Sequence, residues 1–209
     1  MRITQIEEVG KGRYNIFLDG EPAFVLYKKE ADRYGLRMGE ELDEMTYQEI
    51  LHDVLGTRSK RYCMNLLKTM DRTEWQLRQK LSQGGYPQEV IRQAIDYVKG
   101  WGYVDDGAYA KKYVEFHREK KSLIQMRQEL YHRGVAREEI DRALEEADVA
   151  DETIAIQKWI EKKRMDLNKA TPSERQKLYM FLLRKGFSPD NVGKVFKRAG
   201  EFHETDTFT

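Results

Sequence analysis

The side chains that most often carry catalysis or bind metals are few in this sequence. None of its four histidines has the spacing of a metal site: His52, His117, His132 and His203. The single cysteine, Cys63, lies among apolar residues and is interpreted as an inert core thiol. The sequence contains no Gly-x-x-x-x-Gly-Lys-Ser/Thr phosphate loop and no Gly-x-Ser-x-Gly nucleophile turn. We therefore expect no enzyme activity, no catalytic residue, no metal site and no cofactor.

One pair of adjacent carboxylates, Asp105 and Asp106, has two interpretations. The pair could act as an acid pair or bind a metal ion. It could also cap a helix that begins near Gly107, where carboxylates accept hydrogen bonds from free amide groups and face the positive end of the helix dipole. We favour the helix cap.

Cationic side chains remain as candidates, because they occur in short clusters. The candidates for binding a partner or a nucleic acid are Lys111, Lys112, Lys120, Lys121, Arg127, Arg133, Lys162, Lys163 and Arg164. Several of them lie near expected helix C-termini, where cations favour the helix dipole in any case. The alternative is contact with nucleic-acid phosphates or with an acidic protein surface. The sequence alone leaves both interpretations open.

The distribution of charge has two interpretations: a polyanionic partner for the larger part of the chain, or long exposed helices that simply carry many Lys and Arg. The whole sequence has 37 Lys and Arg against 36 Asp and Glu, a net charge of only +1. Residues 1–57 carry 7 basic and 12 acidic side chains, whereas residues 58–209 carry 30 and 24. Within the larger part, residues 151–200 have a balance of +6 and residues 106–150 a balance of −1. Such an asymmetry between segments is typical of proteins with charged partners.

Several classes of protein are excluded by composition. Uncharged apolar runs are far shorter than the ~18 residues that a membrane-spanning helix requires. A single cysteine cannot form an intrachain disulfide framework, and the first residues do not resemble a signal peptide. We expect a cytoplasmic, monomeric protein that does not associate with membranes.

Residues 1–57 are predicted to form a small β-containing region. Apolar residues alternate near the start, and Asp19-Gly20 separates two further apolar runs, which is typical of a β-hairpin with positive φ at both turn residues. We expect three short strands, then a short helix over 28–34 that ends at Gly35, then a second helix over 46–55 that ends at Gly56. A polar joint at 57–61 marks the predicted domain boundary.

The rest of the chain contains a threefold repeat. A helix-capping pattern of Thr or Ser with Gln or Glu three residues later begins at Thr73, Ser122 and Thr171, at intervals of 49 residues. Each following helix is expected to end at a glycine: Gly85, Gly134 and Gly186. Apolar residues at matching positions lie before the cap and after the glycine, so each unit is predicted to contain three helices.

We therefore predict a mainly α protein in which three tandem three-helix repeats form an elongated, curved array behind the β-containing region. Repeat 1 covers residues 58–105, repeat 2 covers 106–150 and repeat 3 covers 151–200, with an acidic flexible tail at 201–209. A helix triplet alone is expected to bury little apolar surface, so neighbouring repeats should stack. The helix–turn–helix within each repeat also resembles DNA-reading motifs, but the acidic residues of 136–147 argue against base reading by repeat 2.

Three segments resemble the RecX family of bacterial regulators. Residues 101–113 read Trp-Gly-Tyr-Val-Asp-Asp-Gly-Ala-Tyr-Ala-Lys-Lys-Tyr, which is similar to the family's Gly-Tyr-aliphatic-Asp-Asp segment with its following aromatic residues. Residues 72–87 and 128–135 also resemble the family, and Trp75 departs from its usual aliphatic residue. The residues that mark the repeats and this segment are Gly85, Gly134, Gly186, Trp101, Gly102, Tyr103, Asp105 and Asp106.

The resemblance implies a non-enzymatic regulator of RecA, the recombinase that polymerises on single-stranded DNA. It implies binding to RecA and to its filament on single-stranded DNA, with inhibition of the recombinase, ATPase and SOS co-protease activities. The alternative is a helix-turn-helix regulator that binds DNA directly, and weak direct DNA binding is compatible with both. Trp101 and Tyr103 are interpreted as core residues rather than as a surface for stacking on bases.

Overall fold

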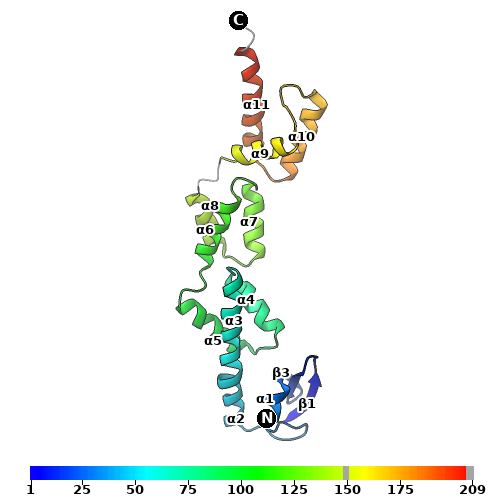
Figure 1. The fold of residues 1–209 in the computed structure, drawn as a ribbon, viewed down its shortest axis with the longest axis vertical. Coiled ribbons are helices and arrows are strands. Elements are labelled where there is room, and N and C mark those ends of the chain that lie inside the picture. Colours follow the sequence, from blue (N-terminus) through cyan, green and yellow to red (C-terminus); the bar gives the residue numbers. More distant parts are fainter. Residues whose placement is uncertain (148–150, 206–209) are drawn as a thin grey trace. The chain divides into compact units, whose positions relative to one another are not determined.

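The computed structural model describes residues 1–147 and 151–205. The chain forms two compact units, Met1–Asp105 and Asp106–Thr209. The first unit contains a small sheet and the helices of repeat 1, and the second contains the helices of repeats 2 and 3 (Figure 1). How all three repeats are arranged into an elongated, curved array stays a prediction.

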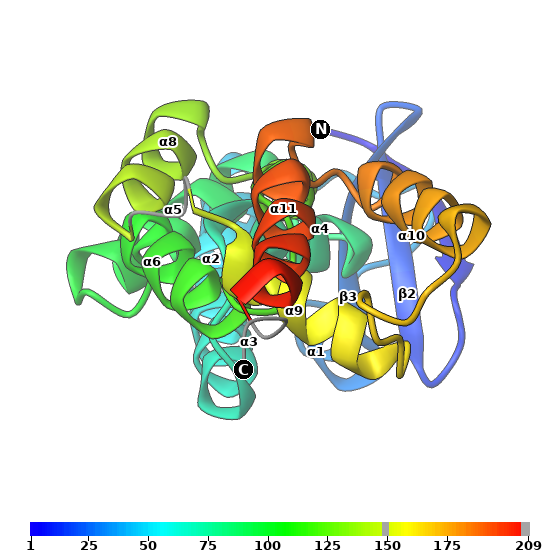
Figure 2. The same ribbon diagram turned by 90° about the horizontal axis from the view of Figure 1, so that it is seen from above.

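The N-terminal sheet has the predicted three strands. They are antiparallel in the order β1 (Ile3–Glu8), β2 (Arg13–Leu18) and β3 (Glu21–Tyr27). The turn between β2 and β3 has φ of +50° at Asp19 and +92° at Gly20, as the Asp-Gly pair predicts. Helix α1 (Lys28–Arg33) follows at once and lies beside the sheet in both ribbon views (Figure 1 and Figure 2).

The helix predicted to end at Gly56 does not end there. Helix α2 (Glu44–Glu49), a π-helical segment η1 (Ile50–Gly56) and α3 (Thr57–Thr69) follow one another without a break. Gly56 ends no helix because its backbone is right-handed helical, with φ of −60° and ψ of −48°. The prediction of a joint at 57–61 is therefore wrong as to local structure, since these residues form the first turns of α3. The domain limit drawn there stays a prediction.

Repeat 1 consists of α3, α4 (Glu74–Gln83) and α5 (Gln88–Gly100). Its core contains Leu77, Leu81 and Ile95, and Cys63 is fully buried among them. Burial raises the pKa of the Cys63 thiol to about 11, as expected for an inert core thiol. Val90 of α5 packs instead with the core of the N-terminal sheet.

Arg58 connects repeat 1 to the N-terminal sheet through hydrogen bonds and an ion pair. Its guanidinium group donates to the Val25 carbonyl oxygen (2.6 Å) and pairs with Glu30 at 2.5 Å. It also donates to the Tyr86 hydroxyl (3.1 Å) and lies 4.9 Å from the centre of the Tyr27 ring. Because the pair is mostly shielded from solvent and bonded on several sides, it fixes β3 against α3 and the α4–α5 turn.

Gly85, in the α4–α5 turn, also contacts β3. Its φ is +75°, and its carbonyl oxygen accepts a hydrogen bond from the Val25 amide (3.2 Å). A Cβ atom at this position would overlap the Val25 side chain. Glycine is therefore required here for two reasons, the left-handed backbone and the close approach of a strand.

Trp101 and Tyr103 are exposed, so the prediction that they belong to the core is wrong. The exposed fraction is 67% for Trp101 and 51% for Tyr103. Gly102, with φ of +71°, ends α5: its amide donates to the Lys99 carbonyl, and the Tyr103 amide donates to that of Val98. This turn directs both aromatic side chains to the surface and buries the following Val104.

The second unit contains six helices in the described part of the chain. Those of repeat 2 are α6 (Asp106–His117), α7 (Leu123–His132) and α8 (Arg137–Glu146). Those of repeat 3 are α9 (Thr153–Lys162), α10 (Pro172–Arg184) and α11 (Pro189–Thr205). With α3–α5, the described residues thus contain the nine repeat helices that the sequence predicts. Helix α11 continues to Thr205, and residues 206–209 lie outside the described residues, so the acidic flexible tail at 201–209 stays a prediction.

Each repeat has a core of its own. Met126, Leu130 and Ile140 belong to the buried cluster of repeat 2, and Leu182 and Val192 to that of repeat 3. Each of these triplets thus has a buried cluster of its own, and the expectation that a triplet alone buries little apolar surface stays a prediction. The apolar positions four residues apart are buried as predicted.

Two of the three predicted capping boxes are complete. Thr73 and Thr171 each accept a hydrogen bond from the amide three residues later, while Gln76 and Glu174 reach back to the cap amide. Ser122 accepts from the Gln125 amide, but the reciprocal bond does not form. The side-chain amide of Gln125 donates to Glu129. Positive φ at Gly85, Gly134 and Gly186 confirms the predicted helix ends.

No helix in the described residues is long and apolar enough to cross a membrane.

The two roles of Gly85 can be separated by substitution. Gly85→Ala and Gly102→Ala both place a side chain at a φ above +70°, but open space surrounds Gly102. We expect Gly102→Ala to lower the free energy of unfolding by about 1–2 kcal/mol and Gly85→Ala by about 1–3 kcal/mol more. Urea denaturation measures both losses, and equal losses would show that the contact with Val25 contributes nothing.

Candidate functional site

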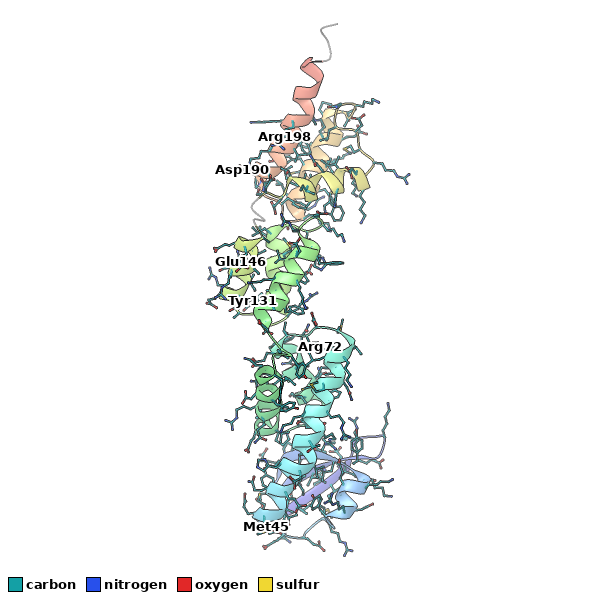
Figure 3. The ribbon with its side chains drawn as sticks, turned by 60° about the vertical axis from the view of Figure 1, so that its left-hand side comes forward. Met45, Arg72, Tyr131, Glu146, Asp190 and Arg198 are labelled. Atoms are coloured by element: carbon teal, nitrogen blue, oxygen red, sulfur yellow. The ribbon has the colours of Figure 1, made fainter. Side chains whose placement is uncertain are left out.

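At least four of the nine cationic candidates form ion pairs within repeat 2. These pairs are Lys111 with Glu146 (2.8 Å), Lys121 with Glu129 (2.6 Å), Arg133 with Glu129 (3.9 Å) and Arg127 with Asp141. Glu146, which is labelled in Figure 3, lies in the last turn of α8. The acidic side chains of α8 thus partly neutralise the cations of α6 and α7. Partner binding by these four side chains stays a prediction.

The most enclosed of these contacts centre on Glu129. Its carboxylate accepts hydrogen bonds from Lys121 Nζ and from the Tyr113 hydroxyl. Burial alone would raise the pKa of Glu129, but these hydrogen bonds outweigh burial and lower the pKa to about 2. Burial and the same carboxylate raise the pKa of Tyr113, whereas burial and nearby Lys121 lower that of His117. Glu129 therefore makes a charged contact between α6 and α7, and protonation of its carboxylate at low pH would weaken this contact.

A second group of cations carries no ion pair. The ammonium groups of Lys120, Lys162, Lys163 and Lys185 have no carboxylate within 4.0 Å among the described residues. Each lies over an aromatic ring instead. The distances from Nζ to the ring centre are 4.6 Å for Lys120 over Phe116, 4.8 Å for Lys162 over Trp159, 4.5 Å for Lys163 over Phe181, and 5.1 and 5.8 Å for Lys185 over Trp159 and Phe181. We call these four lysines and three rings the lysine–aromatic cluster.

The cluster lies where α9 and α10 end. Trp159 packs edge-on against Phe181, with 5.5 Å between ring centres, and its indole N–H donates to the Lys120 carbonyl oxygen (3.0 Å). This hydrogen bond connects the turn after α6 to α9. Lys163 follows α9, and Lys185 follows α10.

The electrostatics of the cluster suit an anionic partner. Contact with ring faces holds each ammonium group by a cation–π attraction without neutralising its charge. It also orders the flexible lysine stems, so less conformational entropy remains to be lost on binding. Four positive charges without carboxylate partners can therefore bind phosphate or carboxylate oxygens. Because an ammonium group lies over each ring, the arrangement favours contact with charged groups over stacking on bases.

The structure brings together three predicted residues and adds one that the prediction missed. Lys120, Lys162 and Lys163 belong to the cluster, and Lys185 was missed. Arg164 is next in sequence and has φ of +52°, and Lys112 lies exposed on α6; neither is part of the cluster. The signal for Lys185 is in the sequence, because Phe116/Lys120, Trp159/Lys163 and Phe181/Lys185 are all aromatic–lysine pairs four residues apart.

The two adjacent aspartates lie where a helix begins. Asp106 begins α6 and Asp105 precedes it, and their role as caps of this helix stays a prediction. Among the described residues, no group of three or more His, Cys, Asp or Glu side chains is arranged to hold a metal ion.

The repeats match known protein families segment by segment. Residues 60–97 match the first three-helix domain of RecX, residues 105–144 the second, and residues 151–196 the third. A protein named regulatory protein RecX from Caldanaerobacter subterraneus subsp. tengcongensis is 30% identical over 93% of this chain and 98% of its own length. The chain belongs to the RecX family.

Other members agree in length and in structure. Regulatory protein RecX of Clostridioides difficile is 29% identical over 98% of both chains. A crystal structure of a regulatory protein RecX, also 29% identical, superposes with a TM-score of 0.60 over 94% of this chain and 98% of the other. The matches therefore include the N-terminal sheet as well as the three RecX repeats, and they place this chain in a family of regulatory proteins.

The low pKa of Glu129 predicts acid sensitivity that Glu129→Gln removes. The pKa of an unfolded glutamate is about 4.3, against about 2 in the folded chain, so the stabilisation is complete above the unfolded value and is lost as pH falls toward 2. We expect the difference in unfolding free energy between wild type and Glu129→Gln to be largest near pH 6 and to shrink steadily below about pH 4.5. Urea titrations at a series of pH values measure this difference, and a constant difference would contradict the low pKa.

Proposed function

We propose that this RecX-family chain is a non-enzymatic regulator that binds RecA and the RecA filament on single-stranded DNA. Binding lowers the recombinase, ATPase and SOS co-protease activities of RecA and so restrains DNA repair and recombination in the cytoplasm. The observation that carries the proposal is the match along nearly the whole chain to proteins named regulatory protein RecX. The protein acts as a monomer without a cofactor, with domain limits at 57/58, 105/106, 150/151 and 200/201.

The lysine–aromatic cluster supports this proposal, because a RecA filament on DNA offers both phosphate oxygens and protein carboxylates. The ammonium groups of Lys162, Lys163 and Lys185 can contact either kind of oxygen without first breaking an ion pair with a described residue. Such a contact adds charge attraction, which raises the association rate and makes binding sensitive to salt.

A RecA ATPase assay on single-stranded DNA tests the proposed function. We expect suppression of ATP hydrolysis at protein concentrations well below that of RecA, without displacement of RecA by competition for bare DNA. A pull-down with RecA in the absence of DNA tests the protein contact separately. An unchanged ATPase rate at equimolar protein would refute the proposal.

The alternative is direct DNA binding by a helix-turn-helix regulator. Its support is the same cluster, since lysines bind phosphates without RecA. Its binding to DNA alone should weaken steeply with salt, because each phosphate contact releases a counterion. The acidic α8, with Glu138 and Glu139 in its first turn, argues against a role as a base-reading helix. DNA binding in the absence of any effect on RecA would favour this alternative.

Charge reversal tests the cluster itself. We expect Lys162→Glu, Lys163→Glu and Lys185→Glu together to weaken filament binding by about tenfold or more, because like charges then face the anionic partner. The control replaces Lys169, Lys177 and Lys197 by Glu, which makes the same change in net charge at exposed positions of repeat 3 outside the cluster. Fluorescence anisotropy of a labelled filament measures affinity, and circular dichroism checks the helix content. Equal weakening by both triple variants would show that only net charge matters.

A further inference from the structure

The lysine–aromatic cluster is built from two repeats. Phe116 and Lys120 come from the end of repeat 2, whereas the other members come from repeat 3. The two repeats have separate apolar cores, so the cores do not hold the halves of the cluster together. Another contact must fix them.

That contact centres on Glu152, a buried carboxylate with an exposed fraction of 4%. One of its oxygens accepts from the Leu123 amide at the start of α7 (2.8 Å). The other accepts from the Ser188 amide just before α11 (2.9 Å) and from Asn191 Nδ2 (3.3 Å). Glu152 therefore caps a helix of repeat 2 and a helix of repeat 3 at the same time.

Glu152 makes no such bond to its own helix. The Thr153 amide, at the start of α9, donates to Asp151 (2.9 Å), so the Glu152 side chain is free to reach the other two helices. No lysine, arginine or histidine lies within ion-pair distance of it among the described residues. Its charge is therefore stabilised by amide donors and by the positive ends of two helix dipoles.

Among the described residues, three further side-chain hydrogen bonds cross the same junction. One is an ion pair between Lys158 of repeat 3 and Glu119 of repeat 2, and the other two involve the backbone of cluster lysines. Ser122 accepts from the Gln125 amide and donates its hydroxyl proton to the Lys185 carbonyl oxygen (2.8 Å). A Cβ atom on the neighbouring Gly186 would lie 2.8 Å from Ser122 Oγ. On the other side, Trp159 donates to the Lys120 carbonyl. The backbones of two cluster lysines are thus held across the junction.

We propose that Glu152 is a positioning residue that locks repeat 2 against repeat 3 and thereby assembles the lysine–aromatic cluster as one anion-binding surface. Without its carboxylate, two helix N-termini lose a buried acceptor, while each repeat keeps its own core. The repeats then move relative to each other, and Lys120 separates from the lysines of repeat 3. The effect on partner binding rests on the proposed function, whereas the effect on the junction does not.

Glu152→Gln tests the lock with little change in size. The amide retains one acceptor oxygen but places an NH2 group against backbone N–H donors, so it cannot make both sets of bonds. Ser122→Ala is a second variant that removes the bond to Lys185. Thr171→Ala is the matched control, because it also removes a helix-capping hydroxyl, but from α10 inside repeat 3 and away from the junction.

The readout is the distance between spin labels at Arg137→Cys in repeat 2 and Lys177→Cys in repeat 3, in a full-length Cys63→Ser background. Arg137 and Lys177 are exposed. We expect a narrow distance distribution in the unsubstituted background and with Thr171→Ala, and a broad one with Glu152→Gln and Ser122→Ala. Filament affinity should fall about tenfold with Glu152→Gln and little with Thr171→Ala.

Each outcome decides the proposal. A narrow, unchanged distance distribution in Glu152→Gln would show that Glu152 does not hold the two repeats together. A broad distribution with unchanged filament affinity would show that holding them together does not matter for anion binding by the cluster. If Glu152→Gln does not fold, Ser122→Ala carries the same comparison against Thr171→Ala. If the wild-type chain fails to bind the filament, the proposed function fails, and the distance measurement still decides whether Glu152 locks the repeats.

Discussion

The termini of short helices are the constraint on which this structure depends. Most of the repeat helices span 10 to 13 residues, so a large share of their backbone groups are amides and carbonyls without a partner inside the helix. Such groups are costly when buried. The chain satisfies them with Thr73 and Thr171 within a repeat, and with Glu152 from a neighbouring repeat. At Glu152, the same hydrogen bonds both cap helices and join two repeats.

The turn glycines serve the same purpose at the other helix end. Gly85 brings its turn against Val25 of the sheet, and Gly186 brings the equivalent turn of repeat 3 against Ser122 of repeat 2. In both cases the missing side chain allows the turn to touch the element that precedes the repeat. One repeat position thus has two uses, ending a helix with positive φ and docking the repeat on its predecessor.

The sequence predicted what is local and missed what depends on distant partners. The Asp19-Gly20 turn, the capped helices and the buried apolar positions follow from spacing and backbone preference alone. Gly56 was misread because a glycine ends a helix only when its backbone becomes left-handed, and here it remains helical. Trp101 was placed in the core by its apolar character, although the turn at Gly102 directs it outward. The sequence pattern around Glu152 does not indicate its capping role, because the three groups that donate to it lie 29 to 39 residues away.

The difference between repeats 2 and 3 explains why most of the candidate site lies in repeat 3, at the ends of α9 and α10. Both repeats carry lysines and arginines near helix ends, where cations stabilise the helix dipole. In repeat 2 the carboxylates of Glu129, Asp141 and Glu146 neutralise several of them, in keeping with its balance of −1. Repeat 3 has a balance of +6, and aromatic rings rather than carboxylates support Lys162, Lys163 and Lys185, although Lys158 and Lys169 do form ion pairs. The same repeat architecture thus gives repeat 2 cations that pair with its own carboxylates. In repeat 3 it gives cluster lysines that lie over aromatic rings without a carboxylate partner among the described residues.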